Sequence, residues 1–387
     1  MRPIPLRLAA LATGLALGTF GLSTPAHAAA VAIPLTWQVG GHTATPQEVS
    51  DFWTLENLRF ANAAGHQPAA VSQGHDDALS SPTPKTGLSG RTVGKIFSLK
   101  STNAPEITDH LLRTTCSGNV VNSANKSVVL SAGHCVKTEV PNPNSGSGQP
   151  ATLQEFILNG VFIPGFDGST LDAKAAANPN GQVDSAIAPY GMWVITKVWV
   201  TDTWNTAPYF AFGQDMSALT VVKPGGPLPI QDVTGGQQVA FDQPRAAVTT
   251  AIGYPQDNTR FWYHPFRNGV VPNPPDPTIA LADHGVPAGD RRENDGKVML
   301  QAVGTSRQGN WPYLDPRMAA ALGAGASGGP WFQQYDPATG AGVQTGVSSK
   351  NESPAGGIAA WSEGPDLVAT YFESQEKQAY DAAAATP

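Results

Sequence analysis

The feature that most constrains the fold is a series of short apolar runs separated by loops rich in proline, glycine and asparagine. The chain has 41 glycines and 34 prolines among 387 residues, so nearly a fifth of it consists of turn-forming residues. Such runs are typical of β-strands, and the frequent turn formers disfavour a helical bundle. The sequence therefore predicts an all-β fold, with strands in TVGKIFSL, NVVNSANKSVVL, MWVITKVWV, ALTVV, AVTTAIGY, RFWYH, KVMLQAV and GVQTGVS.

Residues 1–28 have the pattern of a secretory signal peptide. Arg2 and Arg7 form a basic start, residues 8–22 are apolar and small, and an Ala-His-Ala cleavage site ends at residue 28. The apolar run is too short to cross a bilayer, and no later run reaches about 18 residues. We therefore expect a secreted, extracellular protein that has no membrane anchor.

Residues 29–90 contain a helix start followed by a linker. Thr45, Pro46 and Glu48 fit an N-cap, a first helical position and a capping box, and the apolar pattern continues to about Ala64. Glycine, serine, proline, histidine and aspartate then dominate up to residue 90, as in an exposed linker. We expect residues 29–90 to be a propeptide with its linker, so that the protein is made as a zymogen. A loosely docked N-terminal arm is the alternative.

Residues 91–387 are expected to form one folded domain that ends in a helix. Leu367, Tyr371 and Phe372 stand at helical spacing, so the sequence predicts this helix over residues 366–380.

Charge and cysteine content limit the partners. A formal net charge of −7 disfavours nucleic acid and offers no basic stripe to an anionic membrane. The two cysteines, Cys116 and Cys135, are expected to form a disulfide in an exported protein, and their region offers too few further ligands for zinc. No motif for a metal cluster, phosphate loop or cofactor is present in the sequence, so neither a metal nor a cofactor is expected.

Two turns carry side chains that could react. Ser327 lies in GAGASGGPWF, where the glycines disfavour helix and strand and leave a small hydroxyl beside accessible backbone N–H groups. His134 follows an apolar strand in VVLSAGHC, and a disulfide at Cys135 would hold it rigidly. Each alone has a simpler interpretation, as a surface turn or a structural histidine. Together they favour a nucleophile and its general base.

These turns resemble the motifs of a known enzyme family. SAGHC, with a cysteine 19 residues before its own, resembles the catalytic-histidine motif of trypsin-like serine proteases, and GASGGP resembles their nucleophile motif. The likeness covers roughly residues 91–372 and is greatest to secreted bacterial members near the glutamyl-endopeptidase branch. It implies two six-stranded antiparallel β-barrels of chymotrypsin type, a C-terminal helix, and an active site between the barrels.

The resemblance also implies roles for particular residues. His134 is expected to be the general base, Ser327 the nucleophile, and the N–H groups of Gly325 and Ser327 the oxyanion hole. The family needs an acid between histidine and serine. Asp215, in GQDMSALTVV, precedes an alternating apolar strand and is predicted to orient the imidazole, with Asp184 and Asp202 as alternatives.

Several positions bear on activation and specificity. Ala326 replaces the aspartate that pairs with a newly cut N-terminus in many members, so activation by that ion pair is not expected. Ala321, six residues before Ser327, replaces the aspartate of trypsin-like specificity, which disfavours cleavage after arginine or lysine. Ser348 and Ser349 are expected at the edge of the substrate pocket, and small or apolar side chains are the predicted preference.

The predicted function is that of a monomeric, secreted serine endopeptidase that cleaves proteins or peptides through an acyl-enzyme. Two alternatives stay open. The G-x-S-x-G pattern around Ser327 also fits a secreted esterase of the α/β-hydrolase type, although that fold needs a histidine after the serine and none follows here. The other alternative is a catalytically inactive binding protein on a protease scaffold.

Overall fold

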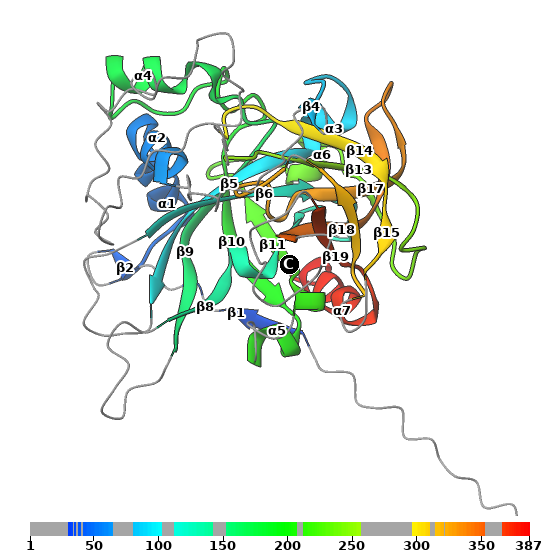
Figure 1. The fold of residues 1–387 in the computed structure, drawn as a ribbon. Coiled ribbons are helices and arrows are strands. Elements are labelled where there is room, and N and C mark those ends of the chain that lie inside the picture. Colours follow the sequence, from blue (N-terminus) through cyan, green and yellow to red (C-terminus); the bar gives the residue numbers. More distant parts are fainter. Residues whose placement is uncertain are drawn as a thin grey trace, which may run out of the picture.

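The structure is a computed structural model that describes residues 30–33, 35, 38–39, 42–64, 80–102, 112–141, 152–206, 212–256, 296–309, 314–320, 322–352 and 366–387. The predicted signal peptide, the predicted strand in RFWYH and Ala321 lie outside these described residues. The described strands form two large sheets, arranged side by side in Figure 1, and one small pair, β2 (Gln38–Val39) with β3 (His42–Thr43).

The first sheet has eight strands, and six of them close into an antiparallel barrel. Its strands are β1 (Val31–Ile33), β5 (Val93–Thr102), β6 (Leu112–Val120), β7 (Val128–Ser131), β8 (Lys137–Pro141), β9 (Thr152–Pro164), β10 (Trp193–Val200) and β11 (Ser217–Val222). The barrel order is β10-β11-β7-β6-β5-β9, and pairing of β9 with β10 closes it. β1 and β8 extend the sheet at β10 and β9.

The second sheet is larger and belongs to the second half of the chain. Its strands are β4 (Ser81–Pro82), β12 (Gln238–Val239), β13 (Val248–Gly253), β14 (Leu300–Thr305), β15 (Arg307–Gln308), β16 (Pro316–Ala319), β17 (Pro330–Asp336), β18 (Ala341–Glu352) and β19 (Asp366–Tyr371). The order is β15-β16-β19-β18-β17-β13-β14-β4, with β12 beside β18 as its parallel partner. A closed barrel, a second sheet and a C-terminal helix confirm the predicted chymotrypsin-type, all-β fold.

Short helices and turns connect the strands. They are α1 (Pro46–Phe52), α2 (Leu55–Ala64), α3 (Gly87–Thr92), α4 (Leu171–Ala177), α5 (Asp202–Thr206), α6 (Ile230–Thr234), α7 (Ser374–Ala384) and the 3-10 turns η2 (Gly133–Cys135), η3 (Gly168–Thr170) and η4 (Phe212–Gln214). In the described part of the chain, no helix combines the length and apolar character that crossing a bilayer requires.

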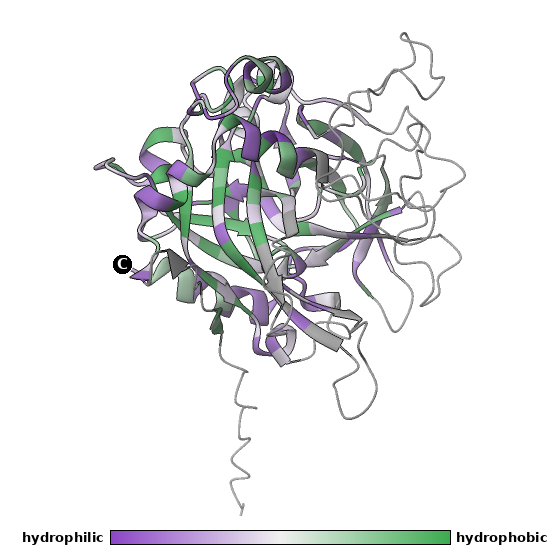
Figure 2. Cartoon of the chain, turned by 90° about the vertical axis from the view of Figure 1, so that its left-hand side faces the viewer, coloured by the Kyte–Doolittle hydropathy of each residue, from purple (hydrophilic) through white to green (hydrophobic). Residues whose placement is uncertain are grey.

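The strands bury apolar side chains in separate cores. One core fills the first barrel and includes Ile96, Phe162 and Trp193, whereas another lies in the second sheet and includes Met318 and Trp331. Figure 2 shows hydrophobic residues running along the barrel strands. Because burial of apolar surface is the main driving force of folding, each half of the molecule supplies much of its own stability.

The N-terminal segment joins both halves. α1 begins as predicted, with Thr45 as N-cap and a complete capping box with Glu48. Trp53 and Leu58 are fully buried in a core that also contains Phe97 from the first sheet and Phe332 from the second. A loosely docked arm is therefore the wrong alternative, because these side chains are part of the interior. Removal of residues 29–90 as a propeptide stays a prediction.

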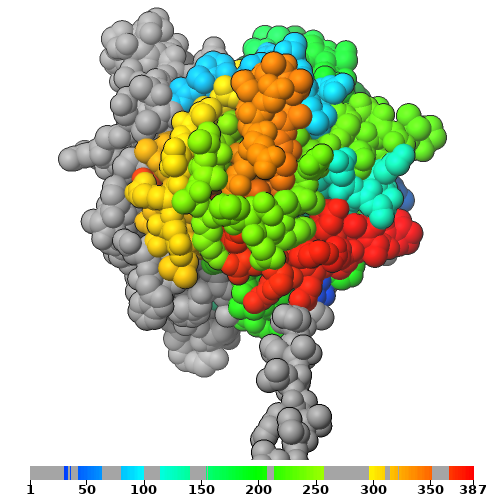
Figure 3. Space-filling view, turned by 90° about the vertical axis from the view of Figure 1, so that its right-hand side faces the viewer, coloured from blue at the N-terminus to red at the C-terminus, as the bar shows by residue number. Residues whose placement is uncertain are grey.

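The C-terminal prediction needs a correction. Residues 366–371 form strand β19 between β16 and β18, and the helix begins only at Ser374. All six residues of β19 are buried, so apolar residues occur on both faces and imitate a helical pattern. α7 packs against β10, β11 and β7, and Figure 3 shows these red C-terminal residues across one face of the molecule.

Candidate active site

His134 lies on a turn that three links hold in place. Strand β7 is completely buried, and η2 follows it directly. The disulfide between Cys116 and Cys135, predicted from the sequence, is present and ties this turn to β6. The hydroxyl of Ser217 donates to the carbonyl of Ala132 at 2.8 Å, which links the turn to β11 as well. The imidazole is therefore mounted on a rigid part of the first barrel.

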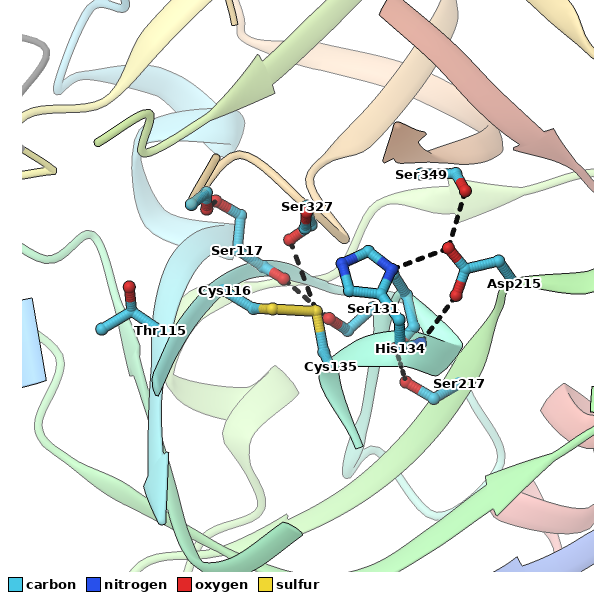
Figure 4. The surroundings of a disulfide bond; sticks show 12 residues. Thr115, Cys116, Ser117, Ser131, His134, Cys135, Asp215, Ser217, Ser327 and Ser349 are labelled. Carbon is cyan, nitrogen blue, oxygen red and sulfur yellow. Dashed lines mark hydrogen bonds and ion pairs between the residues drawn. A yellow bond between two sulfur atoms is a disulfide. The ribbon is translucent and has the colours of Figure 1, made fainter. Parts of the chain in front are cut away.

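Asp215 lies beside His134 and accepts three hydrogen bonds. Its Oδ1 accepts from the His134 backbone N–H at 2.7 Å, and its Oδ2 lies 2.7 Å from His134 Nδ1. The hydroxyl of Ser349 donates to the same Oδ2 at 2.6 Å. Figure 4 shows the imidazole and Ser349 converging on this carboxylate.

The environment keeps this carboxylate charged although only 2% of Asp215 is exposed. Burial alone would raise its pKa, but the charge of His134 and the hydrogen bonds from His134 and Ser349 outweigh that effect, so the pKa of Asp215 is lowered. An ionised carboxylate facing Nδ1 favours the ring tautomer that carries its proton on Nδ1, so that Nε2 is the unprotonated nitrogen.

The two alternative acids lie elsewhere. Asp184 is exposed, and its carboxylate contacts Lys174 Nζ at 2.6 Å. Asp202 begins α5, where its backbone carbonyl accepts from the Thr206 hydroxyl, and no bond from its carboxylate to His134 is present among the described residues. Of the three candidates, the structure brings only Asp215 to the histidine.

Ser327 lies on a glycine-rich loop that both sheets hold. Ser117 of β6 donates its backbone N–H to the Ser327 carbonyl at 2.7 Å, and Gly328 donates to the Ser348 carbonyl of β18 at 2.7 Å. Gly328 has a φ of +79°, and a Cβ there would lie 2.1 Å from the hydroxyl oxygen of Ser131. A larger residue is therefore excluded at this position both by conformation and by space.

The loop leaves three polar groups available. Among the described residues, the N–H groups of Gly325 and Ser327 and the Ser327 hydroxyl have no hydrogen-bond partner. Sγ of Cys135 lies 3.8 Å from the Ser327 carbonyl oxygen, which places the serine loop next to the histidine turn. In Figure 4 the His134 ring lies between Asp215 and Ser327. In enzymes that use such a pair, the hydrogen bond between the nucleophile and its base often becomes short and well aligned only when the substrate is bound.

The residues expected at the pocket edge have other partners. The Ser348 hydroxyl is buried and accepts from Trp331 Nε1 at 3.0 Å, whereas the Ser349 hydroxyl binds Asp215. Ala321 is outside the described residues. Cys116, Cys135 and His134 place two sulfurs and a ring nitrogen within 4.8 Å, but both sulfurs belong to the disulfide and provide no thiolate for a metal.

Sequence reasoning missed Ser117 and expected Ser349 in a different role. Ser117 connects the serine loop to β6, and its position next to Cys116 was a signal that could have been used. Ser349 was placed at the pocket edge although its hydroxyl supports the acid. The sequence gives no signal for that contact, because Ser349 and Asp215 are 134 positions apart.

Comparison with known proteins supports the fold. No protein-family model matches the chain, and no curated protein matches it. The crystal structure of the protease Anisep from Arthrobacter nicotinovorans has a TM-score of 0.51 and 20% identity, covering 80% of this chain and 100% of that chain. A thermostable serine protease, AL20, from an extremophilic microorganism gives 0.48 and 23%, covering 77% and 98%. A Glu endopeptidase structure gives 0.47 and 14%, covering 80% and 99%.

The architecture of the chain defines its fold class. The closed antiparallel barrel, the second sheet and the C-terminal helix are those of the trypsin-like fold, and the likeness to Anisep extends over that protein's whole length. The chain therefore has the fold of bacterial trypsin-like serine proteases. Because a fold hosts more than one function, the activity has to be argued from the residues of the site.

Proposed function

We propose that the protein is a secreted serine endopeptidase in which Ser327, His134 and Asp215 form the catalytic triad. The observation that carries the proposal is the His134 ring, which binds buried Asp215 through Nδ1 and has Ser327 on its other side. This is the order of acid, base and nucleophile that acyl transfer requires.

The proposed reaction has two halves. Ser327 Oγ attacks the carbonyl carbon of a peptide bond while His134 Nε2 takes the hydroxyl proton. His134 then gives this proton to the leaving amine, the C–N bond breaks, and an acyl ester remains on Ser327. In the second half, water attacks the ester, its proton passes through His134 to Ser327 Oγ, and the carboxylic acid product leaves.

Backbone groups supply the charge stabilisation. The N–H groups of Gly325 and Ser327 are available, as an oxyanion hole requires, and each such donor is worth about 3 kcal/mol in mutated proteases. Asp215 stabilises the imidazolium that forms at each proton transfer. Its lowered pKa keeps it ionised through the cycle.

The proposed substrate is a protein or peptide, and the chemistry needs no cofactor. Ala321 disfavours an arginine or lysine side chain before the cut bond, and we propose small or apolar side chains there. The signal sequence over residues 1–28 supports export, and a monomer is proposed. Digestion of a peptide library, with product sequencing, tests the side-chain preference.

The Ser327→Ala variant tests the function. Wild type should hydrolyse unfolded protein substrates such as casein, and Ser327→Ala should lower kcat by about 10⁵-fold or more, because removal of the nucleophile ends covalent catalysis. The exposed Ser185→Ala is the matched control and should keep full activity. Hydrolysis that survives in Ser327→Ala contradicts the proposal. An inactive wild type that still binds peptides favours the binding-protein alternative.

A further inference from the structure

Gln256 is a buried glutamine that joins three separate parts of the molecule. It follows β13 by three residues and is 1% exposed. Its Nε2 donates to the Asn62 carbonyl of α2 at 2.8 Å, and its Oε1 accepts from the Thr115 hydroxyl of β6 at 2.6 Å. Its backbone N–H donates to the Ala324 carbonyl at 2.6 Å. Both functional ends of this side chain are therefore bonded to protein.

The bond to Ala324 reaches the serine loop directly before the proposed oxyanion donor. Gly325 has a φ of +87°, and a Cβ there would lie 2.6 Å from the Tyr254 carbonyl oxygen and 3.0 Å from Gln256 Cγ. The Gly325 carbonyl in turn accepts from the Ser117 hydroxyl at 2.9 Å. Gln256 thus forms part of the surface against which Gly325 is packed, and it fixes the direction of the Gly325 peptide.

The other end of this connection is the N-terminal helix α2. Asn62 is 4% exposed, and besides its carbonyl bond to Gln256 its side-chain oxygen accepts from Lys95 Nζ. Lys95 is fully buried on β5 and also donates to the Gly296 carbonyl at 2.7 Å. Removal of α2 would take away the acceptors of Gln256 Nε2 and one acceptor of Lys95 Nζ, and a buried donor that loses its acceptor costs free energy.

We propose that Gln256 is a positioning residue for the oxyanion hole, and that helix α2, held through Asn62, is a permanent part of the active enzyme. The inference rests on the proposed serine endopeptidase function. Ala326, fully buried beside the nucleophile, cannot form an ion pair with a new N-terminus. In this chain the connection from α2 through Gln256 holds the serine loop without any N-terminal cut. A permanent α2 and the sequence-based prediction that residues 29–90 are removed exclude each other, and fluorophosphonate labelling distinguishes them.

The matched test compares two buried glutamines. Gln237 is fully buried and also bridges two segments, with Nε2 donating to the Gly340 carbonyl at 2.8 Å and Oε1 accepting from Gly342 N–H at 3.0 Å. Gln256→Met and Gln237→Met each remove three buried side-chain hydrogen bonds at similar side-chain volume. Gln256→Met keeps the backbone hydrogen bond to Ala324 but releases the side chain that anchors this backbone to Asn62 and Thr115, whereas Gln237 has no hydrogen bond to the serine loop among the described residues.

We expect Gln256→Met to lower kcat by about 10- to 100-fold with KM within twofold of wild type, because a small displacement of the donors affects the transition state alone. Affinity for a peptide aldehyde, which forms a tetrahedral adduct, should fall in parallel. Gln256→Glu keeps an oxygen that accepts from the Thr115 hydroxyl, so it should lower kcat less than Gln256→Met does. Gln237→Met should keep kcat. An unchanged kcat in Gln256→Met, or equal losses in both methionine variants, would overturn the inference.

A second measurement needs no variant. The wild-type protein, purified without denaturant, is labelled with a fluorophosphonate, and peptides of the labelled species are identified by mass spectrometry. The active species should contain residues 46–62, whether or not the chain has been cut after them. A fully active species that lacks these residues would overturn the inference. If wild type neither hydrolyses peptides nor takes the label, the proposed function fails, and this inference fails with it.

Discussion

Two buried carboxylates in this protein have pKa values that are shifted in opposite directions. Asp215 lies beside His134, and Glu376 lies in the first turn of α7; they are 2% and 1% exposed. The pKa of Asp215 is lowered, because the charge of His134 and three hydrogen bonds outweigh burial. The pKa of Glu376 is raised to about 8, chiefly by burial and further by the nearby charges of Glu373 and Asp315.

The number of donors explains the difference. Both oxygens of Asp215 are bonded, to the backbone and ring of His134 and to Ser349. Glu376 accepts from the Glu373 N–H through one oxygen at 3.0 Å, whereas its other oxygen has no partner among the described residues. A buried acid is therefore charged only where the fold delivers donors to it. The proposed active site is such a place, and the start of α7 is not.

Of the variants that test this comparison, Asp215→Asn should have the largest effect on kcat. An amide at this position has the same shape but cannot stabilise the imidazolium, and it favours the wrong ring tautomer. We expect kcat to fall by about 10⁴-fold. Glu376→Gln is the matched control and should leave kcat within twofold of wild type. Equal activity of Asp215→Asn and wild type would remove Asp215 from the mechanism.

Glu376→Gln should change how stability depends on pH. The folded pKa of about 8 lies above the usual glutamate pKa of 4.5, so stability that wild type has below pH 4.5 is lost progressively as pH rises from 4.5 through 8. The variant carries no such charge and should exceed wild type by roughly 3 to 5 kcal/mol at pH 9, with no difference near pH 4.

Urea unfolding at pH 4, 7 and 9 measures this effect. Both proteins should carry Ser327→Ala so that self-digestion does not distort the curves. Asp215 has the opposite sign, because a lowered pKa contributes stability above the unfolded pKa and loses it as pH falls. A Glu376→Gln variant that is no more stable than wild type at pH 9 would contradict the comparison.

Ser349→Ala should have the smallest effect. It removes one of three donors to Asp215 and should raise the pKa of this carboxyl. A hydrogen bond to a charged group is worth about 1.5 to 3 kcal/mol, of which only the part gained in the transition state affects catalysis, so we expect kcat to fall by roughly 5- to 20-fold.

Ser348→Ala is the neighbouring control. The Ser348 hydroxyl binds Trp331 Nε1 at 3.0 Å, so its removal should cost about 1 to 2 kcal/mol of folding stability and change kcat less than twofold. Steady-state kinetics and urea unfolding of both variants separate the two roles. Equal kcat in the two variants would remove Ser349 from the support of Asp215.

Local sequence patterns were enough to predict the candidate histidine and serine and the disulfide. SAGHC and GASGGP predicted where His134 and Ser327 lie, and the cysteine pair predicted the disulfide that the structure contains. These features depend on residues close together in the chain. The strand preceding the acid favoured Asp215 over Asp184 and Asp202, but only the folded chain shows which carboxylate meets the imidazole.

Long-range packing explains what the sequence did not reveal. The bonds of Gln256 connect residues 194 and 141 positions away, and no local pattern marks it. The helical pattern in residues 366–372 was misleading, because both faces of β19 are buried and both carry apolar residues. The composition of the N-terminal segment predicted a separate propeptide and linker. In the structure, however, Trp53 Nε1 donates to the Asn159 carbonyl at 2.9 Å in the interior.

The most direct test of the central claim is the site and rate of fluorophosphonate labelling. The account predicts that the native protein forms one adduct, on Ser327, and that His134→Ala and Asp215→Asn slow its formation by several orders of magnitude while the protein stays folded. An adduct on another residue, or an unchanged labelling rate in His134→Ala, would contradict the claim that this imidazole activates this serine.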